Sequence, residues 1–137
     1  MQGYNVIMLY SPSGEQVLMC RRKKEPYLGM SNFVGGKIEI GEAGLAAAYR
    51  ELLEETGIDK THVELRHVMD FTYYYSNCYV EVYAGRLKED ANVFGDENRL
   101  YWSELNHDFF DVREYAGEGN IGHMLLQVDM HRMKILG

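Results

Sequence analysis

Five glutamates fall within the 24 residues GGKIEIGEAGLAAAYRELLEETGI, which occupy positions 35–58. Strong helix formers fill this segment and Gly57 is a natural helix end, so we expect a helix that begins at Glu42 or Ala43 and ends at Thr56. With about 100° of rotation per residue, three glutamates share one side of that helix. They are Glu51, Glu54 and Glu55. The residues of the neighbouring arc, which would face the core, are Leu45, Ala48, Tyr49 and Leu52.

This carboxylate face (Glu51, Glu54 and Glu55) is unfavourable on its own. One interpretation is a solvated acidic surface, the usual role of exposed charges. However, Glu51 and Glu55 are like charges four residues apart, which costs about 0.2–0.5 kcal/mol. The negative end of the helix dipole adds about 0.3–1 kcal/mol for each carboxylate, and only Arg50 offers local compensation. A divalent cation would turn the repulsion into attraction, and hard oxygen ligands select Mg²⁺ or Mn²⁺.

The residues in front of the helix suggest a complementary site. Gly35 and Gly36 let the backbone come close to a ligand or a metal, because no side chain stands in the way. Lys37 adds a positive charge beside them. A Gly-Gly-Lys sequence can equally be a plain bend. Followed by this helix, it predicts a phosphate position next to a metal site.

The spacing of these residues resembles a known motif. The Nudix box reads Gly-x5-Glu-x7-Arg-Glu-U-x-Glu-Glu-x-Gly-U, where U is a bulky aliphatic residue. The nine matching residues are Gly36, Glu42, Arg50, Glu51, Leu52, Glu54, Glu55, Gly57 and Ile58. The chain therefore resembles the Nudix hydrolase family. This resemblance implies hydrolysis of a nucleoside diphosphate linked to another group X, with Mg²⁺ or Mn²⁺ as the cofactor.

The resemblance also implies roles for single residues. The three glutamates of the carboxylate face would be catalytic metal ligands, together with the Gly35 carbonyl. Arg50 would orient the glutamates, and Lys37 would contact phosphate. Glu97 lies five residues before Trp102, where MutT-type members carry an extra metal-binding or catalytic glutamate. The alternative for Glu97 is a surface glutamate in a turn.

The residues that distinguish one group X from another must lie outside the Nudix box. The segment Asn32–Lys37 resembles that of MutT-type nucleoside triphosphate sanitisers, in which an asparagine three residues before the first glycine reads the base. Asn32 would have this role, or would cap the end of a strand. Oxidised-purine sanitisers carry paired aspartates before the last helix, and here Glu118 could substitute. The resemblance thus implies a nucleoside triphosphate diphosphatase that releases a monophosphate and pyrophosphate.

Three alternatives stay open. Dinucleoside-polyphosphate members often carry a tyrosine about 16 to 18 residues after the box, near which Tyr73, Tyr74 and Tyr75 lie. ADP-ribose members typically carry a proline about 16 residues after the box, and this chain has only Pro12 and Pro26. A non-catalytic nucleotide-sensing domain would often lack box glutamates, which are intact here.

The other segments of the chain must form the strands and helices that position these residues. Asn5–Tyr10 and Gln16–Cys20 read as a hairpin around the turn Ser11–Gly14. We expect a loop over 25–31, a short strand over 32–40 broken at the two glycines, and strands over 62–70, 71–83 and 100–102. An amphipathic helix over 121–135, interrupted near Arg132, ends the chain. This pattern predicts a mixed α/β fold, and the resemblance implies the Nudix α/β/α sandwich with a central Nudix-box helix and a C-terminal helix.

Length and composition limit the other possibilities. The 137 residues suit one domain, residues 1–137. A net charge of −7 argues against a nucleic-acid partner, although a small anionic ligand is compatible with it. Cys20 and Cys78 fit no metal spacing, and no segment resembles a signal peptide or a membrane span. We therefore expect a cytoplasmic monomer or homodimer that acts on a small nucleotide and binds no membrane.

Overall fold

The computed structural model describes residues 1–94 and 99–137. Its strands form one mixed sheet in the order β3-β2-β1-β5-β4, and β6 pairs with β2. The central strands β1 and β5 are parallel, whereas the other strand pairs are antiparallel. The strands are β1 (Gln2–Tyr10), β2 (Gln16–Arg21), β3 (Ser31–Asn32), β4 (Arg66–Tyr73), β5 (Cys78–Arg86) and β6 (Arg99–Glu104).

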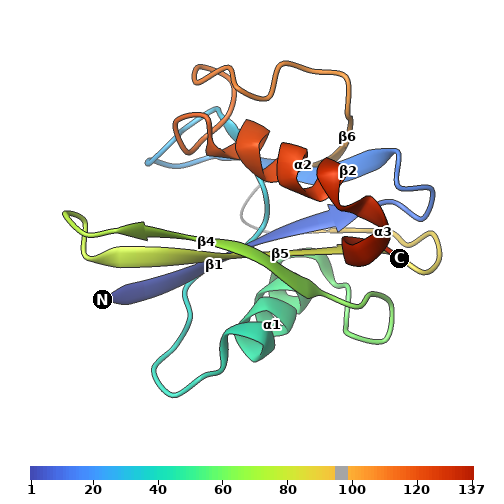
Figure 1. Cartoon of the computed structure of the whole chain (residues 1–137), viewed down its shortest axis with the longest axis horizontal. Coiled ribbons are helices and arrows are strands. Elements are labelled where there is room, and N and C mark those ends of the chain that lie inside the picture. The colour runs from blue at the N-terminus through green and yellow to red at the C-terminus, as the bar shows by residue number, and fades with distance from the viewer. Residues whose placement is uncertain (95–98) are drawn as a thin grey trace.

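Helices cover both faces of this sheet. Figure 1 shows α1 (Gly44–Thr56) on one face and α2 (Asn120–Met130) with the short α3 (Arg132–Ile135) on the other. Side chains alternate along β1, so Ile7 packs with the core on the α1 side and Met8 with the core on the α2 side. The predicted α/β/α sandwich is confirmed.

The box helix ends as its sequence predicts. Gly57 adopts a left-handed conformation with φ of 79°, and its N–H bonds to the Leu53 carbonyl. At the other end, α1 begins at Gly44, one or two residues later than predicted, and Ala43 supplies no side-chain cap. Leu52 is fully buried, so the apolar side of α1 faces the sheet and leaves the glutamates on its remaining surface.

Two predicted strand boundaries were wrong. The strands predicted over 62–70 and 71–83 are instead β4 and β5, joined by a turn at residues 74–77. The turn can form there because Asn77 tolerates a left-handed conformation (φ 52°), whereas its tyrosines had been read as strand formers. The segment predicted as a strand over 32–40 keeps only β3 and isolated bridges to β1 at Val34 and Lys37.

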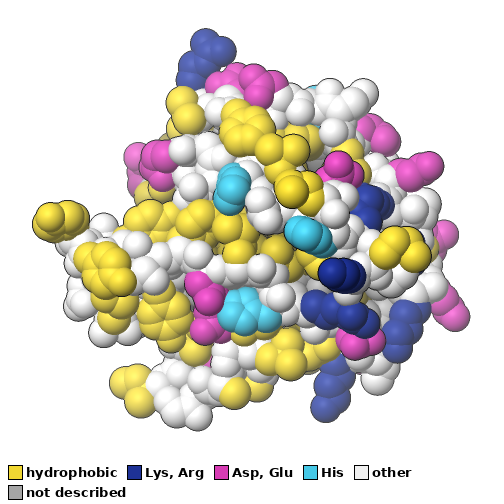
Figure 2. Space-filling model, viewed as in Figure 1, with side chains coloured by type: hydrophobic (Ala, Val, Ile, Leu, Met, Phe, Trp, Pro, Cys, Tyr) yellow, Lys and Arg dark blue, Asp and Glu magenta, His cyan; other side chains and the backbone are white. Residues whose placement is uncertain are grey.

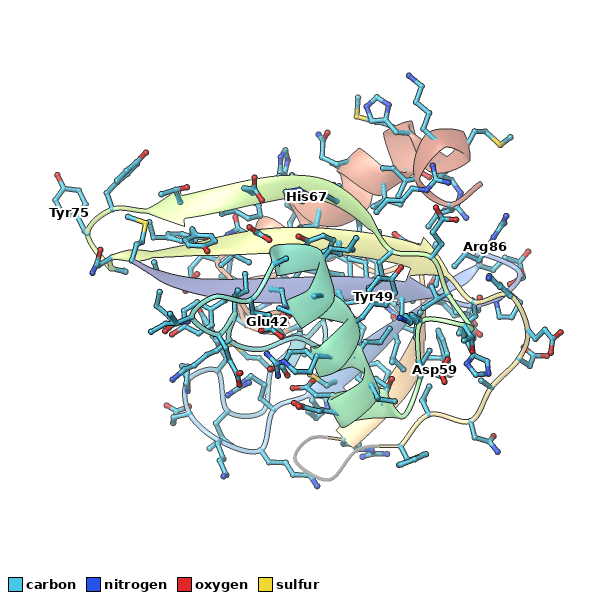
Figure 3. The ribbon with its side chains drawn as sticks, turned by 90° about the horizontal axis from the view of Figure 1, so that it is seen from below. Glu42, Tyr49, Asp59, His67, Tyr75 and Arg86 are labelled. Carbon is cyan, nitrogen blue, oxygen red and sulfur yellow. The ribbon has the colours of Figure 1, made fainter. Side chains whose placement is uncertain are left out.

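The C-terminal helix breaks at His131, one residue before the predicted interruption, and continues as α3. Among the described residues, no helix has the length and apolar character needed to cross a bilayer. Figure 2 shows apolar side chains between β4 and α2, and Lys and Arg side chains near α3 and the C-terminus. The box helix lies on the opposite face of the sheet (Figure 3).

Candidate active site

Arg50 connects the loop before α1 to the carboxylate face. Its Nε and Nη2 donate to the two carboxylate oxygens of Glu42 at 2.7 and 2.9 Å. Its Nη1 donates to Glu51 at 3.1 Å and to Glu54 at 3.3 Å, and Nη2 also donates to the Lys37 carbonyl at 3.0 Å. The hydrogen bonds from Arg50 lower the pKa of Glu42 to about 2. Arg50 therefore holds three carboxylates and one carbonyl in a fixed relationship.

Glu51 lies directly against Gly36. A Cβ atom built on Gly36 would be 2.4–2.5 Å from the Glu51 carboxylate, so only glycine leaves room for this carboxylate. The Glu51 side chain is 13% exposed. Burial raises the pKa of Glu51, although the hydrogen bond from Arg50 opposes this effect. Gly36, which was expected to leave room for a bound substrate or metal, thus also leaves room for Glu51, a predicted metal ligand.

Glu55 contacts the neighbouring glycine. The Gly35 N–H donates to Glu55 Oε2 at 3.3 Å. Burial raises the pKa of the Cys20 thiol to about 11, and the charge of Glu55 adds to this rise. Two of the three glutamates of the carboxylate face, Glu51 and Glu55, therefore meet the same Gly35–Gly36 backbone from one turn of α1.

Asn5 of β1 holds that backbone in place. Its N–H donates to the Gly36 carbonyl at 2.8 Å, and its Oδ1 accepts from the Gly36 N–H at 3.0 Å. A Cβ on Gly35 would lie 2.1 Å from the Asn5 carbonyl oxygen. The Val34 and Gly36 carbonyls both accept from β1, so the Gly35 carbonyl between them points away from β1. It is therefore not used in this pairing.

The donor set of this site suits a hard cation. It consists of carboxylate oxygens and one backbone carbonyl, which Mg²⁺ and Mn²⁺ prefer. Within residues 1–94 and 99–137, however, no three His, Cys, Asp or Glu side chains form a ready metal cluster. Arg50 instead donates to carboxylate oxygens of Glu51 and Glu54. The buried Asn5 Nδ2 is the one buried side-chain N or O in this part of the chain that has no hydrogen-bond partner. An amide N–H donor of this kind can be satisfied by a water or by a ligand oxygen, and it cannot bind the cation itself.

Lys37 follows the two glycines and is exposed. Its backbone pairs with Tyr4 of β1, and its carbonyl accepts from Arg50. Across the described ranges, its ammonium group has no hydrogen bond or ion pair. The ammonium is thus available to an anionic ligand.

A cavity of about 380 Å³ lies on the α2 side of the sheet. It brings together Asn32 and Glu118, two of the three residues predicted to bind substrate, with Val6, Phe71 and Met124 as apolar walls. The third, Lys37, does not line it. Asn32 Oδ1 accepts from the Phe33 N–H at 2.8 Å, so the capping alternative is present in the structure. Because Asn32 also lines the cavity, capping does not exclude a second contact through its Nδ2.

Tyr27 and Glu118 close one side of this cavity. The Tyr27 hydroxyl donates to the Glu118 carboxylate at 2.9 and 3.1 Å. Both residues have left-handed backbones, with φ of 66° and 55°, a strained conformation that is common at functional sites. Burial and the Glu118 hydrogen bond raise the pKa of Tyr27.

The structure separates the other predicted residues. Glu97 lies outside the described residues. Tyr73 lines the cavity and accepts from Asn120. Tyr74 and Tyr75 are exposed in the turn between β4 and β5, and Figure 3 shows Tyr75 at the tip of this hairpin. Sequence reasoning missed Tyr27, Asn120 and the supporting role of Asn5. Only Asn5 carried a signal, as a polar residue at the start of an apolar strand.

Comparison with known proteins agrees with this arrangement. The NUDIX domain family matches residues 1–119 of the chain. One similar solved structure is a MutT protein of Aliivibrio salmonicida or Vibrio cholerae, with 20% identity and a TM-score of 0.70 over 94% of this chain and 98% of that chain. Another is a C. elegans Ap4A hydrolase in a binary complex, with 20% identity and a TM-score of 0.77 over 97% of this chain and 98% of that chain. A third is the NUDIX domain of Shewanella oneidensis NrtR complexed with ADP ribose (16% identity, 95% of this chain and 87% of that chain, TM-score 0.72).

These identities are low, so the solved structures show a shared fold. The family match covers most of the chain, and the box geometry described above lies within it. The chain belongs to the NUDIX domain family. It is a Nudix hydrolase, a class of enzymes that hydrolyse a nucleoside diphosphate linked to another group and that generally need a divalent metal such as Mg²⁺.

Proposed function

We propose that this Nudix hydrolase is a Mg²⁺-dependent nucleoside triphosphate diphosphatase that releases a monophosphate and pyrophosphate. The observation that carries the proposal is the cavity on the α2 side, because one nucleobase fits its volume and it contains Asn32 and Glu118. Asn32 is connected to Lys37 by an extended segment. At about 3.3 Å per residue, Asn32 and Gly35 are about 10 Å apart, a base-to-phosphate separation.

The polar groups of the cavity suit a base edge. The Asn32 Nδ2 supplies a donor while its Oδ1 keeps the bond to Phe33. Glu118 supplies acceptor oxygens that now bind Tyr27. A base with N–H groups would compete with the Tyr27 hydroxyl for Glu118. Asn32 and Glu118 together therefore favour a base that presents an acceptor and a donor on the same edge.

At the other end of the segment, Lys37 would bind the phosphates, and Glu51, Glu54, Glu55 and the Gly35 carbonyl would hold the cation. When bound, Mg²⁺ neutralises phosphate charge and makes water easier to deprotonate. A carboxylate of this face would take the proton from the attacking water, whose oxygen bonds to one phosphorus of the α–β anhydride. The bridging P–O bond breaks at the same phosphorus, and its oxygen leaves with the other phosphate, so that monophosphate and pyrophosphate are the products. Arg50 keeps Glu51 and Glu54 in position, and Glu97 is a further base or ligand in this proposal.

A substrate panel tests the proposal. Normal and oxidised triphosphates, ADP-ribose and diadenosine polyphosphates would be assayed with Mg²⁺ and with EDTA, and products identified by chromatography. We expect the highest kcat/KM for a triphosphate, with monophosphate and pyrophosphate as products and no turnover in EDTA. A higher kcat/KM for ADP-ribose, or binding of a triphosphate without turnover in Mg²⁺, would contradict the proposal.

Asn32→Ala and Asn32→Asp separate base reading from strand capping. Asn32→Asp keeps an oxygen for the Phe33 N–H and removes the donor. We expect both variants to lower kcat/KM for the preferred base about ten- to a hundred-fold, because losing one hydrogen bond and leaving its buried partner unsatisfied costs about 1–3 kcal/mol. Discrimination among bases should flatten. If Asn32→Asp keeps the wild-type ranking of bases, the role of Asn32 is capping alone.

A second candidate is hydrolysis of dinucleoside polyphosphates. Tyr74 is 79% exposed and Tyr75 is fully exposed, next to Tyr73 at the cavity. Exposed aromatic rings beside a base site can stack on a second base. In this case Tyr75→Ala should lower kcat/KM for diadenosine polyphosphates while leaving triphosphate hydrolysis unchanged. The substrate panel decides between the two candidates.

A further inference from the structure

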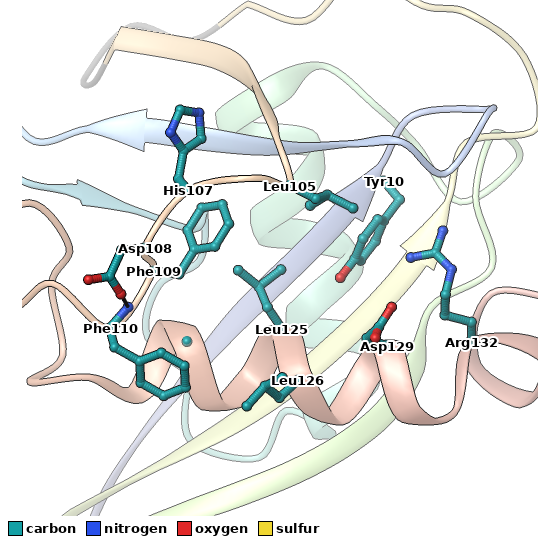
Figure 4. Close-up of a pocket in the computed structure, with 11 residues that line it drawn as sticks. Tyr10, Leu105, His107, Asp108, Phe109, Phe110, Leu125, Leu126, Asp129 and Arg132 are labelled. Atoms are coloured by element: carbon teal, nitrogen blue, oxygen red, sulfur yellow. Dashed lines mark hydrogen bonds between the residues drawn. The ribbon is translucent and has the colours of Figure 1, made fainter.

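A second cavity, of about 280 Å³, lies on the other flank of α2, beneath the segment of residues 105–110 (Figure 4). The helix separates it from the first cavity. Ile121 and Met124 line the first cavity, whereas Leu125 and Leu126 line the second. Nothing in the hydrolase chemistry described above uses this second space.

Two phenylalanines set the shape of the second cavity. Phe110 lies on α2 where Gly122 has no side chain, since a Cβ there would be 2.7 Å from the Phe110 ring. Phe109 is buried (6% exposed) and packs against Tyr115 with ring centroids 5.0 Å apart. These contacts hold the 105–110 segment over the helix. The resulting walls are apolar and suit a flat ring.

One end of this cavity is polar and incompletely bonded. Tyr10 is 1% exposed, and Figure 4 shows its hydroxyl pointing into the cavity toward Leu125 and Asp129. In the part of the chain that the structure describes, this hydroxyl has no hydrogen-bond partner. Burial raises the pKa of Tyr10, so the group stays a neutral donor. A hydroxyl that faces a cavity and has no protein partner can donate to a ligand bound there.

Neighbouring charges restrict what could bind there. Arg132 Nη2 donates to the Gly14 carbonyl at 2.7 Å, and its guanidinium lies 5.7 Å from the centre of the Tyr10 ring. Asp129 stands at the same end of the cavity, and Asp108 at the other. One carboxylate beside a partly used guanidinium and a second carboxylate at the opposite end disfavour an anion such as a nucleotide. Asp129 is itself exposed, and a ligand that offers an acceptor to Tyr10 and a donor to Asp129 complements both groups.

We propose that this second cavity binds a neutral aromatic amide, that is, one flat ring carrying a carboxamide or a lactam edge. An amide edge presents an acceptor and a donor side by side, which complement the Tyr10 hydroxyl and the Asp129 carboxylate. The ring packs between Phe109, Leu125 and Leu126. A cavity of roughly 150 Å³ already holds benzene, so the volume of about 280 Å³ leaves room for one ring and its amide.

The test titrates the full chain with nicotinamide, with its carboxylate counterpart nicotinate and with the lactam 2-pyridone, and follows ¹H–¹⁵N spectra. We expect saturable shifts at Leu105, Gly122 and Leu126 with nicotinamide or 2-pyridone. Whichever of the two saturates first identifies the preferred amide. Nicotinate should bind at least about tenfold more weakly than nicotinamide, because of the two aspartates. Failure of both amides to give saturable shifts at these residues would overturn the proposal.

Two variants locate the binding site. Tyr10→Phe keeps the buried ring and removes only the hydroxyl, so it should fold with unchanged or higher Tm and weaken amide binding about tenfold. Asp129→Asn should reduce the preference for nicotinamide over nicotinate. The matched control is Tyr73→Phe, which removes a hydroxyl on the opposite flank of α2 and should leave amide binding unchanged. The proposal fails if Tyr10→Phe binds like wild type, or if Tyr73→Phe alone weakens binding.

Discussion

Arg50 and Glu42 form a two-pronged ion pair, with Nε to Oε2 at 2.7 Å and Nη2 to Oε1 at 2.9 Å. The pair joins the middle of α1 to the loop that precedes it. Because the same guanidinium also contacts Glu51 and Glu54, the position of Glu42 controls how Arg50 presents them. Planar bidentate pairs of this kind fix geometry as well as adding energy.

Glu42→Gln should lower Tm at neutral pH, with a characteristic pH dependence. Arg50 depresses the pKa of Glu42 from 4.5 to about 2, so the ionised carboxylate stabilises the folded state. This contribution is fully present above the ordinary pKa and is lost as pH falls toward about 2. The difference in Tm between wild type and variant should therefore shrink below pH 4.5.

The control for this prediction is Glu39→Gln, which changes an exposed glutamate in the same loop whose side chain does not pair with Arg50. Its Tm should follow that of wild type at every pH, as measured by circular dichroism melts between pH 7 and about 3. A pH-independent offset for Glu42→Gln would mean that the pair does not stabilise through charge.

Gly36→Ala should damage the site through one specific contact. The new Cβ would lie 2.4–2.5 Å from the Glu51 carboxylate, which must then move. Displacement of a catalytic group by about 1 Å can cost about 100-fold in rate, and we expect a loss of this size in kcat/KM. In a Glu51→Ala background the same substitution should cost little more, because its steric partner is gone. Additive losses in this double-mutant cycle would place the clash elsewhere.

The carboxylate face predicts stabilisation by cations. A metal that binds only the folded state adds about 2.7 kcal/mol at 100 times its Kd, so Mg²⁺ or Mn²⁺ should raise Tm measurably. Glu55→Gln should abolish most of this rise and lower turnover by more than about 100-fold, while leaving the metal-free protein as stable as wild type or slightly more stable. Near-wild-type turnover in both Glu54→Gln and Glu55→Gln would end the metal assignment.

Lys37→Ala should affect substrate handling and not folding. The Lys37 side chain is exposed, and its structural bonds are made by the backbone. We expect KM for the triphosphate to rise about tenfold and the free energy of unfolding to change by less than about 0.5 kcal/mol. Lys60→Ala, another exposed lysine, serves as the matched control. A large loss of stability with unchanged kinetics would make Lys37 a structural residue.

The sequence predicted the sandwich well where local and global signals agree. The box helix and its end at Gly57 follow from helix formers, an apolar side and a glycine whose φ of 79° few other residues tolerate. The β4–β5 turn was misplaced because Tyr73, Tyr74 and Tyr75 read as strand formers. Their role is decided by pairing with β5 and by Asn77, which local propensity does not reveal.

The candidate site was predictable as residues and not as contacts. Motif spacing pointed to Glu51, Glu54, Glu55 and Arg50. It did not reveal that Arg50 lies closer to Glu42 than to Glu51 or Glu54. Long-range neighbours were inaccessible for the same reason. Tyr27 meets Glu118 across 91 residues of sequence, and Asn5 reaches Gly36 across 31, and only the folded chain creates such pairs.

Because α2 lies between the two cavities, its position can couple the binding of one ligand to the binding of another. If the nucleotide and the aromatic amide each favour a different position of this helix, each ligand changes the Kd of the other by the same factor. Such linkage needs no contact between the ligands, since Met124 and Leu125 are adjacent residues that line opposite cavities. Helix packing has few stable arrangements, so a small shift of α2 toward one side would narrow one cavity as it widens the other. Binding of an amide in the second cavity would then change the nucleotide Kd. The size of that change would depend on how strongly the packing of α2 resists movement.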